Sequence, residues 1–247
     1  MRPLASLALL GLVACSANSP TAPSPPEPTP TQYRLATVPA YFEGFYVEGR
    51  YASEPPGGMH IYLLSWDDNM DRITRPGFVS VHSCMWRGPQ FDTSNWQRIV
   101  KEWIIPLEHR GLLAGIYVVD EPGLYGISDE EVAKASAFFG EQGYPTMAVR
   151  SWGNRRLGRL PVDYYSVTGY SFETKKEWVR DFHRDADTDF IVGQAFDAGV
   201  GYEKGIPDQA FWRETARITG KGIISWVWRW QGQTGCANEP TCSGAWL

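Results

Sequence analysis

The chain has 247 residues, with 11 tryptophans, 12 tyrosines, four histidines and four cysteines, and its formal net charge is −5 at pH 7. A net acidic chain without a basic face argues against a nucleic-acid-binding protein. The cysteines and histidines lack the spacing of a zinc site, so we expect neither a metal nor a cofactor. The sequence leaves the oligomeric state open.

The first 15 residues have the features of a secretory signal. Arg2 supplies a positive charge, a short apolar run follows, and the run ends in Leu-Val-Ala-Cys at Cys15. Such a signal is removed on export, and its apolar run is too short to span a bilayer. The last four residues resemble the bacterial lipobox, which implies that Cys15 carries lipid and anchors the protein in the cell envelope. Ser16, in place of an aspartate, favours the outer membrane if the cell has one.

A spacer and one domain follow the signal. Residues 16–32 are rich in proline, serine and threonine and contain no large apolar residue. Such a segment cannot bury enough surface to fold, and its prolines keep it extended. We therefore expect a disordered linker at residues 16–32 and a single domain at residues 33–247.

Apolar runs of strand length recur along the predicted domain. They are apolar on both faces rather than alternating, which is typical of strands buried on both sides in a parallel sheet. We expect strands within residues 59–66, 78–86, 112–119, 146–151, 164–170, 190–196 and 222–230, and an earlier strand near 35–45.

Segments with helical spacing lie between several of these strands. Pro106 is expected to kink the first helix or end it early. Ser128 and Glu131 form a capping box at the start of the second helix, and Gly143 follows its end. The predicted helices cover residues 93–110, 128–142, 174–184 and 208–219.

The alternation of strands and helices indicates an α/β fold. With up to eight strands, we predict a compact (β/α)8 TIM barrel in which some helices are shortened to loops. The alternative is an open doubly wound sheet, which would have a glycine-rich phosphate loop after its first strand. Gly57 and Gly58 precede a strand instead, so that support is missing.

The remaining cysteines also carry predictions. Cys236 and Cys242 lie in a tail that contains glycine and proline, and we expect a small disulfide loop between them in an oxidising compartment. Two free thiols are the alternative. Cys84 lies in an apolar run and is expected to be a buried thiol.

The sharpest local signal is the sequence Asp120-Glu121-Pro122. Two carboxylates end a buried strand, and the proline stops its pairing. In a barrel, the carboxyl ends of the strands form the active face. Partial burial there raises the pKa of a carboxyl group enough to make a general acid. The alternative is a structural acid pair that only ends the strand.

Three segments resemble a group of glycoside-hydrolase-like (β/α)8 barrels. They are Asp-Glu-Pro at 120–122, Gly-Gln-Ala-Phe at 193–196, and Gly-Lys-Gly-Ile-Ile at 220–224, which leads into Trp-Val-Trp. In that group the first motif closes the fourth strand, the second closes the seventh, and the third enters the eighth. The resemblance implies that Glu121 is the acid/base, as in related retaining glycosidases. Asp120 would orient it or accept a hydrogen bond from the substrate.

The sequence departs from well-known glycosidases at the nucleophile, which is usually a glutamate that ends strand seven. Gln194 stands there and cannot act as a nucleophile. Asp197 and Glu173 are the candidates for the second carboxylate, and Asp67 or Asp68 is a further one. Glycoside hydrolysis normally needs two carboxyl groups, so this assignment decides whether the protein is catalytic.

Aromatic and polar residues near the predicted strand ends are candidates for substrate binding. Flat aromatic rings stack on the C–H faces of sugars, although each ring could instead fill the core. Arg150 could bind an acidic sugar or form a structural ion pair, and we expect His82 to pack in the core. The candidates are Trp66, Trp86, Arg150, Trp152, Tyr170, Gln194, Trp226 and Trp228.

Two functions remain open. In the first, a surface-anchored glycoside hydrolase acts on a poly- or oligosaccharide. Glu121 protonates the glycosidic oxygen, and Asp197 or Glu173 attacks the sugar or activates water. In the alternative, a non-catalytic carbohydrate-binding lipoprotein keeps the barrel but lacks the second acid. Both functions have a carbohydrate and a membrane as partners, the latter through Cys15.

Overall fold

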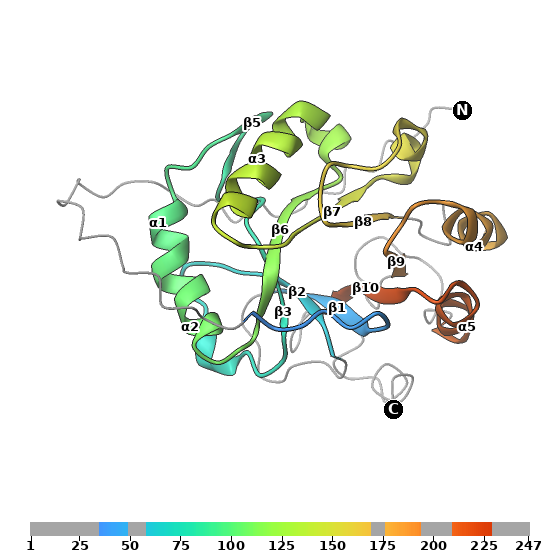
Figure 1. Cartoon of the computed structure of the whole chain (residues 1–247), viewed down its shortest axis with the longest axis horizontal. Coiled ribbons are helices and arrows are strands. Elements are labelled where there is room, and N and C mark those ends of the chain that lie inside the picture. Colours follow the sequence, from blue (N-terminus) through green and yellow to red (C-terminus); the bar gives the residue numbers. More distant parts are fainter. Residues whose placement is uncertain (1–34, 49–57, 169–175, 194–208, 229–247) are drawn as a thin grey trace, which may run out of the picture.

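A computed structural model describes residues 35–48, 58–168, 176–193 and 209–228 (Figure 1). The predicted signal peptide and linker lie outside these ranges. Within the ranges, no helix is both long and apolar enough to cross a membrane.

A single sheet of eight strands organises the fold, and its neighbouring strands are all parallel. Each predicted apolar run contributes one strand, although the first lies later than expected. The strands are β1 (Glu43–Glu48), β2 (His60–Leu63), β3 (Gly77–Ser80), β6 (Leu113–Asp120), β7 (Thr146–Arg150), β8 (Tyr164–Val167), β9 (Phe190–Gly193) and β10 (Gly222–Trp228).

The strands follow one another around the sheet in chain order. The spatial order is β8-β7-β6-β3-β2-β1-β10-β9, and nowhere among the described strands does the direction of winding reverse, as it does in a doubly wound sheet. The sheet curls until Thr168, just after β8, forms a parallel bridge with Val192 in β9. The chain therefore has an α/β fold with a curled parallel sheet, consistent with a TIM barrel at least in part.

The curl gives the sheet an inner and an outer apolar surface. Tyr46 of β1 and Tyr117 of β6 are on strands that are not neighbours, yet their rings meet edge to face with centroids 5.7 Å apart. They belong to the inner cluster. The inner cluster consists of Phe42, Tyr46, Met59, Ile61, Phe78, Ala114, Tyr117, Met147, Val149, Phe190, Val192 and Ile224. The larger outer cluster lies between the sheet and the helices.

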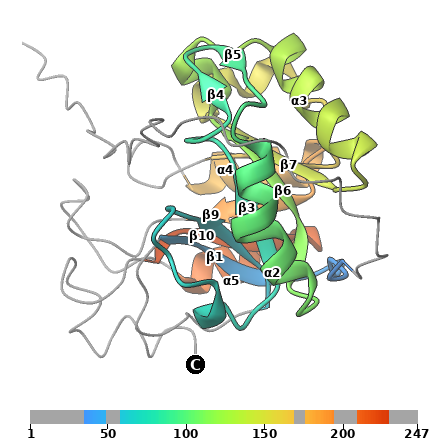
Figure 2. The same ribbon diagram turned by 90° about the vertical axis from the view of Figure 1, so that its left-hand side faces the viewer.

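Helices lie outside the curled sheet in both ribbon views (Figures 1 and 2). The longer ones are α3 (Asp129–Glu141), α4 (Lys176–Asp185) and α5 (Gln209–Thr219). The short elements are α1 (Trp96–Ile99), the π-helix η2 (Val100–Ile104), α2 (Ile105–Glu108) and the 3₁₀ turns η1 (Met70–Arg72), η3 (Pro122–Tyr125) and η4 (Trp152–Leu157).

Two helix predictions are met with local differences. Of the predicted helix at 93–110, residues 96–108 are helical, and a π-helical segment lies just before Pro106, whose ring nitrogen cannot donate to the preceding turn. Ser128 caps α3 by accepting the Glu131 N–H. The Glu131 carboxylate does not complete the capping box, because it accepts the Phe91 N–H at 3.1 Å and pairs with Lys134.

The predicted strand at 78–86 ends early. β3 stops at Ser80, and the backbone turns where the N–H groups of Cys84 and Met85 both donate to the Val81 carbonyl. Trp86 then begins a separate antiparallel hairpin, β4 (Trp86–Arg87) with β5 (Gln90–Phe91). The turn moves the residues after Ser80 out of the regular strand.

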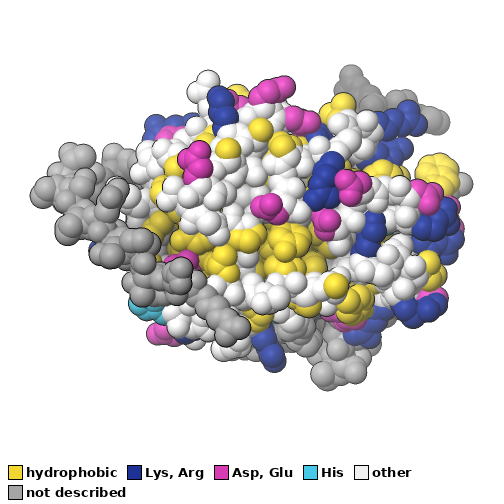
Figure 3. Space-filling model, viewed as in Figure 1, with side chains coloured by type: hydrophobic (Ala, Val, Ile, Leu, Met, Phe, Trp, Pro, Cys, Tyr) yellow, Lys and Arg dark blue, Asp and Glu magenta, His cyan; other side chains and the backbone are white. Residues whose placement is uncertain are grey.

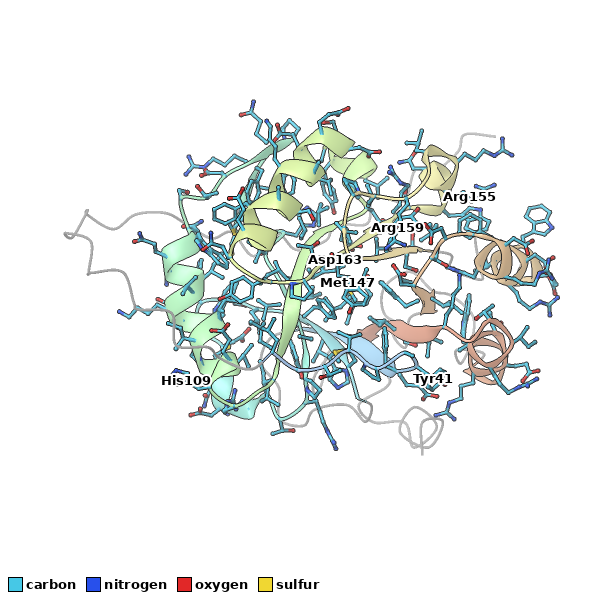
Figure 4. The ribbon with its side chains drawn as sticks, viewed as in Figure 1. Tyr41, His109, Met147, Arg155, Arg159 and Asp163 are labelled. Atoms are coloured by element: carbon cyan, nitrogen blue, oxygen red, sulfur yellow. The ribbon has the colours of Figure 1, made fainter. Side chains whose placement is uncertain are left out.

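Polar side chains fasten the starts of three strands. The Asp163 carboxylate accepts the Thr146 N–H at 2.7 Å, and Arg159 reaches Asp189 at 2.7 Å and the Asp163 carbonyl at 2.8 Å. Figure 4 labels Asp163 and Arg159, together with Met147 of β7. In the same view, Figure 3 shows hydrophobic side chains gathered in the middle of this face. The hydrogen bonds of Asp163 and Arg159 lie beside this apolar surface. These contacts join the starts of β7, β8 and β9.

Gly115 in β6 is required by close packing, and a methyl group there should destabilise the fold. A Cβ atom at Gly115 would lie 2.3 Å from the Pro145 carbonyl oxygen and 2.8 Å from the Phe78 ring. We expect Gly115→Ala to lower the free energy of unfolding by about 2 kcal/mol. Gly140→Ala is the control, because that glycine is exposed in α3 with open space around it. It should raise stability by about 0.5–1 kcal/mol. Urea denaturation measures both, and equal effects would contradict the packing argument.

Candidate active site

A β-bulge in β6, an irregular step with one extra residue, creates the site. Between Tyr117 and Val119 the register with β7 shifts, so that Tyr117 lies opposite Met147 and Asp120 lies opposite Val149. Both of these partners belong to the inner cluster. In a regular strand, residues three apart point to opposite faces. The extra residue at the step brings Asp120 to the same inner face as Tyr117.

Two buried tyrosines hold the Asp120 carboxylate. Tyr117 Oη donates to Asp120 Oδ1 at 2.6 Å, and the hydroxyl oxygens of Tyr46 and Tyr117 are 2.9 Å apart. Burial raises the pKa of Asp120 to about 7; the charge of Glu121 adds to the rise, and the Tyr117 hydrogen bond opposes it. Asp120 is therefore present in both protonation states near neutral pH, which suits a general acid or base.

Glu121 has a backbone conformation that is unusual for its type. Its φ is 44° and its ψ is 56°, in the left-handed region. Its N–H still donates to the Val149 carbonyl at 2.8 Å, and its carboxylate accepts a short hydrogen bond from Thr168 Oγ1. Thr168 is the buried residue that bridges to β9. The left-handed turn thus directs Glu121 toward the carboxyl end of β8.

His82 lies beside the acid pair rather than in the core. Its Nδ1 accepts the backbone N–H of Asp120 at 3.4 Å, and its ring meets the Tyr125 ring edge to face at 4.8 Å. Burial lowers the pKa of His82 to about 4, so the imidazole is neutral at pH 7. Because Nδ1 accepts, the proton of the neutral ring is on Nε2, which can donate. Tyr125 in η3 is 41% exposed.

Two predicted substrate-binding tryptophans are committed to contacts within the protein. Trp66 stacks on Trp103 with ring centroids 4.5 Å apart, and the Arg98 guanidinium lies 4.0 Å from its ring centre. Trp86 donates from Nε1 to the Val118 carbonyl at 2.9 Å. Sugar stacking on Trp66 would require one of these groups to leave, so the packing role holds for Trp66.

The other predicted tryptophans differ in what can be said of them. Trp152 has Arg155 over its ring at 4.2 Å and Phe182 against its edge at 5.3 Å, so it joins η4 to α4. Trp226 and Trp228 lie in β10, as expected, but their side chains are outside the described part of the structure.

A substrate-binding role for Arg150 is not supported. Its side chain is 1% exposed, pairs with Asp129 at 2.9 Å and donates to the Gly158 carbonyl at 3.1 Å. Val149 faces the interior of the sheet, so the next residue along the strand points to the outer side, toward the start of α3. Arg150 is the structural ion pair that was its alternative interpretation.

Two of the four candidates for a second carboxylate, Asp67 and Asp68, lie within the described ranges. Asp67 is exposed, and Asp68 accepts the Ser65 N–H at 2.7 Å in the turn after β2. The residues that lie outside the described part are Cys15, Tyr170, Glu173, Gln194, Asp197, Cys236 and Cys242. Among the described residues, no group of three or more His, Cys, Asp or Glu side chains could hold a metal ion.

The prediction of a free thiol at Cys84 is wrong. Cys84 is 6% exposed, as expected, but it is disulfide-bonded, and its partner lies outside the described residues. The backbone turns after β3 ends at Ser80, so Cys84 lies outside the regular sheet. A cysteine inside the sheet would be enclosed by the neighbouring strands and could not reach a partner.

The sequence reasoning missed five residues that surround the acid pair. Tyr46 and Thr168 are distant in sequence, and only the curl of the sheet brings them close. Tyr117 would point away from Asp120 in a regular strand. The sequence predicts a core position for His82, and the place of Tyr125 just after the Asp-Glu-Pro motif is the signal that points to it.

Comparisons with known proteins add little. No protein-family model matches the sequence. No curated protein matches it either. Among solved structures, the chain is similar to the crystal structure of AP endonuclease, family 2 from Brucella melitensis. The TM-score is 0.40 and the identity 12%, over 77% of this chain and 94% of that one. A similarity this low supports no statement about function.

The left-handed backbone at Glu121 should reverse the usual order of glycine and alanine. Both Glu121→Gly and Glu121→Ala remove the carboxylate, but only glycine adopts a positive φ without steric cost. We expect the glycine variant to be more stable than the alanine variant by about 1 kcal/mol. Chemical denaturation of the pair measures this difference. An alanine variant of equal or higher stability would show that the backbone at residue 121 is not strained.

The raised pKa of Asp120 should make its contribution to stability depend on pH. The neutral carboxyl is favoured in the folded state, so its contribution is present in acid and is lost as the pH rises through about 7. Asparagine stays neutral. The free energy of unfolding of Asp120→Asn, relative to wild type, should therefore increase between pH 4 and pH 8.

His82 provides a control of opposite sign. Its pKa is lowered to about 4, so the stability contributed by the neutral ring is present above pH 6.5 and is lost as the pH falls through about 4. His82→Gln should gain stability relative to wild type in acid. Denaturation at a series of pH values measures both variants, and a difference that stays constant with pH would refute the corresponding assignment.

Proposed function

We propose that this protein is a lipid-anchored glycoside hydrolase of the cell envelope that acts on a poly- or oligosaccharide by carboxyl acid/base chemistry. The observation that carries the proposal is the acid pair at the carboxyl end of β6. Asp120 has a pKa of about 7 beside Glu121, and both side chains are partly exposed. A carboxyl group that is half protonated at neutral pH is the acid that glycosidic bond cleavage needs.

The fold in this proposal is a compact (β/α)8 barrel. The strand order and the bridge between Thr168 and Val192 support it. The 3₁₀ turns η1 and η4 lie where a regular barrel has helices after β2 and β7, which accounts for the short chain. An acid pair at the end of a barrel strand lies on the face that carries activity in such folds.

The proton is assigned to Asp120 rather than Glu121. The sequence resemblance implies Glu121 as the acid, but the raised pKa and the Tyr117 contact are found at Asp120. Asp120 would protonate the glycosidic oxygen, and the adjacent Glu121 charge would favour keeping that proton until the substrate takes it. Asp197 or Glu173 remains the proposed second carboxylate, which attacks the sugar or activates water.

Exposed groups next to the pair could contact a sugar. Tyr125 and Leu124 follow the Asp-Glu-Pro motif and are 41% and 64% exposed. An exposed aromatic ring can stack on the C–H face of a sugar. His82 supplies an Nε2–H donor for a hydroxyl group on the same side. These residues take the place of Trp66, whose ring is already covered on both faces.

The N-terminal end of the described domain and the acid pair lie at opposite ends of β6. The Ala36 N–H donates to the Leu113 carbonyl at 2.7 Å, so the chain enters the domain at the start of this strand. Asp120 ends the strand, about 23 Å away at the usual rise per residue. In this proposal the anchor on Cys15 joins the domain at the end of β6 that is away from the acid pair.

Hydrolysis of a broad poly- and oligosaccharide panel by residues 33–247 tests the proposal. Wild type should release products, and Asp120→Asn should reduce the rate about 10²–10⁴-fold, because it removes the proton donor and keeps the shape. Asp71→Asn is the matched control: Asp71 is exposed on η1, and its carbonyl accepts from Arg110 near the start of β6.

Each other result has a definite meaning. Full activity of Asp120→Asn together with loss in Glu121→Gln would return the acid role to Glu121. Binding without cleavage would favour the carbohydrate-binding lipoprotein. If the protein neither binds nor cleaves any sugar of the panel, the proposal is refuted, and the acid pair is structural.

A further inference from the structure

A row of hydrogen-bonded polar groups lies among the apolar side chains inside the curled sheet. Tyr46 and Tyr117 both have 0% exposure and both belong to the inner cluster. Their hydroxyl oxygens are 2.9 Å apart, and Tyr117 Oη lies 2.6 Å from Asp120 Oδ1. Two phenylalanines would fill the same volume without burying hydroxyl groups. Burying a hydroxyl is costly unless it is hydrogen-bonded, so this chain needs a reason.

The direction of the hydrogen bonds follows from the inventory of protons. Each tyrosine hydroxyl has one hydrogen to donate. Tyr117 donates its hydrogen to Asp120 Oδ1, so the hydrogen between the two tyrosines comes from Tyr46. A donated hydrogen bond strengthens the next donor in the chain. Tyr46 therefore makes Tyr117 a better donor to the carboxylate.

We propose that Tyr46 and Tyr117 form a hydrogen-bond relay that positions Asp120 and tunes its acidity from inside the sheet, an inference that rests on the proposed acid function of Asp120. Tyr117 occupies Oδ1, so the exchangeable proton of the acid is held on Oδ2. The relay stabilises the ionised form and limits how far burial raises the pKa. Tyr46 and Tyr117 are positioning residues that act through Asp120.

Other groups around Asp120 also bear on its titration. Glu121 is next in the chain and favours the protonated form. Burial raises the pKa of Tyr125 in η3, and the nearby charges of both acids raise it further. His82, after β3, accepts the Asp120 N–H and is neutral above pH 4. None of these three groups has a hydrogen bond to the Asp120 carboxylate among the described contacts, whereas Tyr117 donates one, so removing the Tyr117 hydroxyl should have its own effect on the titration.

The titration of Asp120 in the full-length chain tests the relay without any substrate. Aspartate labelled with ¹³C at Cγ is followed by NMR across pH 4–9, and the Asp120 signal is identified by its absence in Asp120→Asn. Tyr117→Phe should raise the midpoint by about one pH unit, since a hydrogen bond to a charged group is lost. Tyr46→Phe, which leaves the Tyr117 contact in place, should raise it by less.

Tyr164→Phe is the matched control. Tyr164 also packs on the inner cluster, with its ring edge-on to Phe78, but it lies at the start of β8, at the other end of the sheet. Its removal should leave the Asp120 midpoint unchanged. An unchanged or lowered midpoint in Tyr117→Phe, or a shift as large in Tyr164→Phe, overturns the relay. If Tyr117→Phe does not fold, the Tyr46→Phe shift decides.

The outcome is separable from that of the proposed function. The NMR midpoints do not depend on hydrolysis, so a relay can be established in a protein that cuts no sugar. If the panel does identify a substrate, the same variants should displace the basic limb of the pH–rate profile upward, by the shift seen in the NMR titration. If the enzyme is active but Tyr117→Phe changes neither its pH–rate profile nor the Asp120 midpoint, the relay is refuted and the proposed hydrolase function stands.

Discussion

The irregular step in β6 is the constraint on which the site depends. Without the extra residue between Tyr117 and Val119, Asp120 would point to the outer side of the sheet, toward the helices. With it, the carboxylate lies at the inner edge, within reach of Tyr117. The pairing of β6 with β7 resumes beyond the step and continues to the Glu121 N–H. One inserted residue thus brings the Asp120 carboxylate at the strand end into contact with Tyr117.

Burial acts on the two titratable neighbours in opposite directions with the same result. Desolvation disfavours the charged form of each, so it raises the pKa of Asp120 and lowers that of His82. Both groups are neutral in weakly acidic solution, and only Asp120 changes its charge near pH 7. The left-handed backbone at Glu121 adds a local cost at the same place. Costs gathered at one strand end are typical of a site kept for function rather than for stability.

Five of the aromatic side chains fall into two sets by position. Trp66, Trp86 and Trp152 lie outside the curled sheet, where they join helices, hairpin and loops to it. Tyr46 and Tyr117 lie inside it, with their hydroxyl groups directed to Asp120. Trp66, Trp86 and Trp152 therefore serve packing, whereas Trp178 in α4 is 59% exposed.

The sequence by itself determined the class of fold, the strands and most helices, and the acid pair at a strand end, because these depend on local hydrophobic pattern, caps and turn residues. The tertiary structure alone decided which side chains meet that pair. Regular alternation predicts the wrong face for Asp120 relative to Tyr117, and no local pattern encodes the step that corrects it. Thr168 and Tyr46 join the site because parallel strands distant in sequence converge when the sheet curls. Arg150 is not part of the site, because its neighbour Val149 points to the inner face and Arg150 therefore points outward to Asp129.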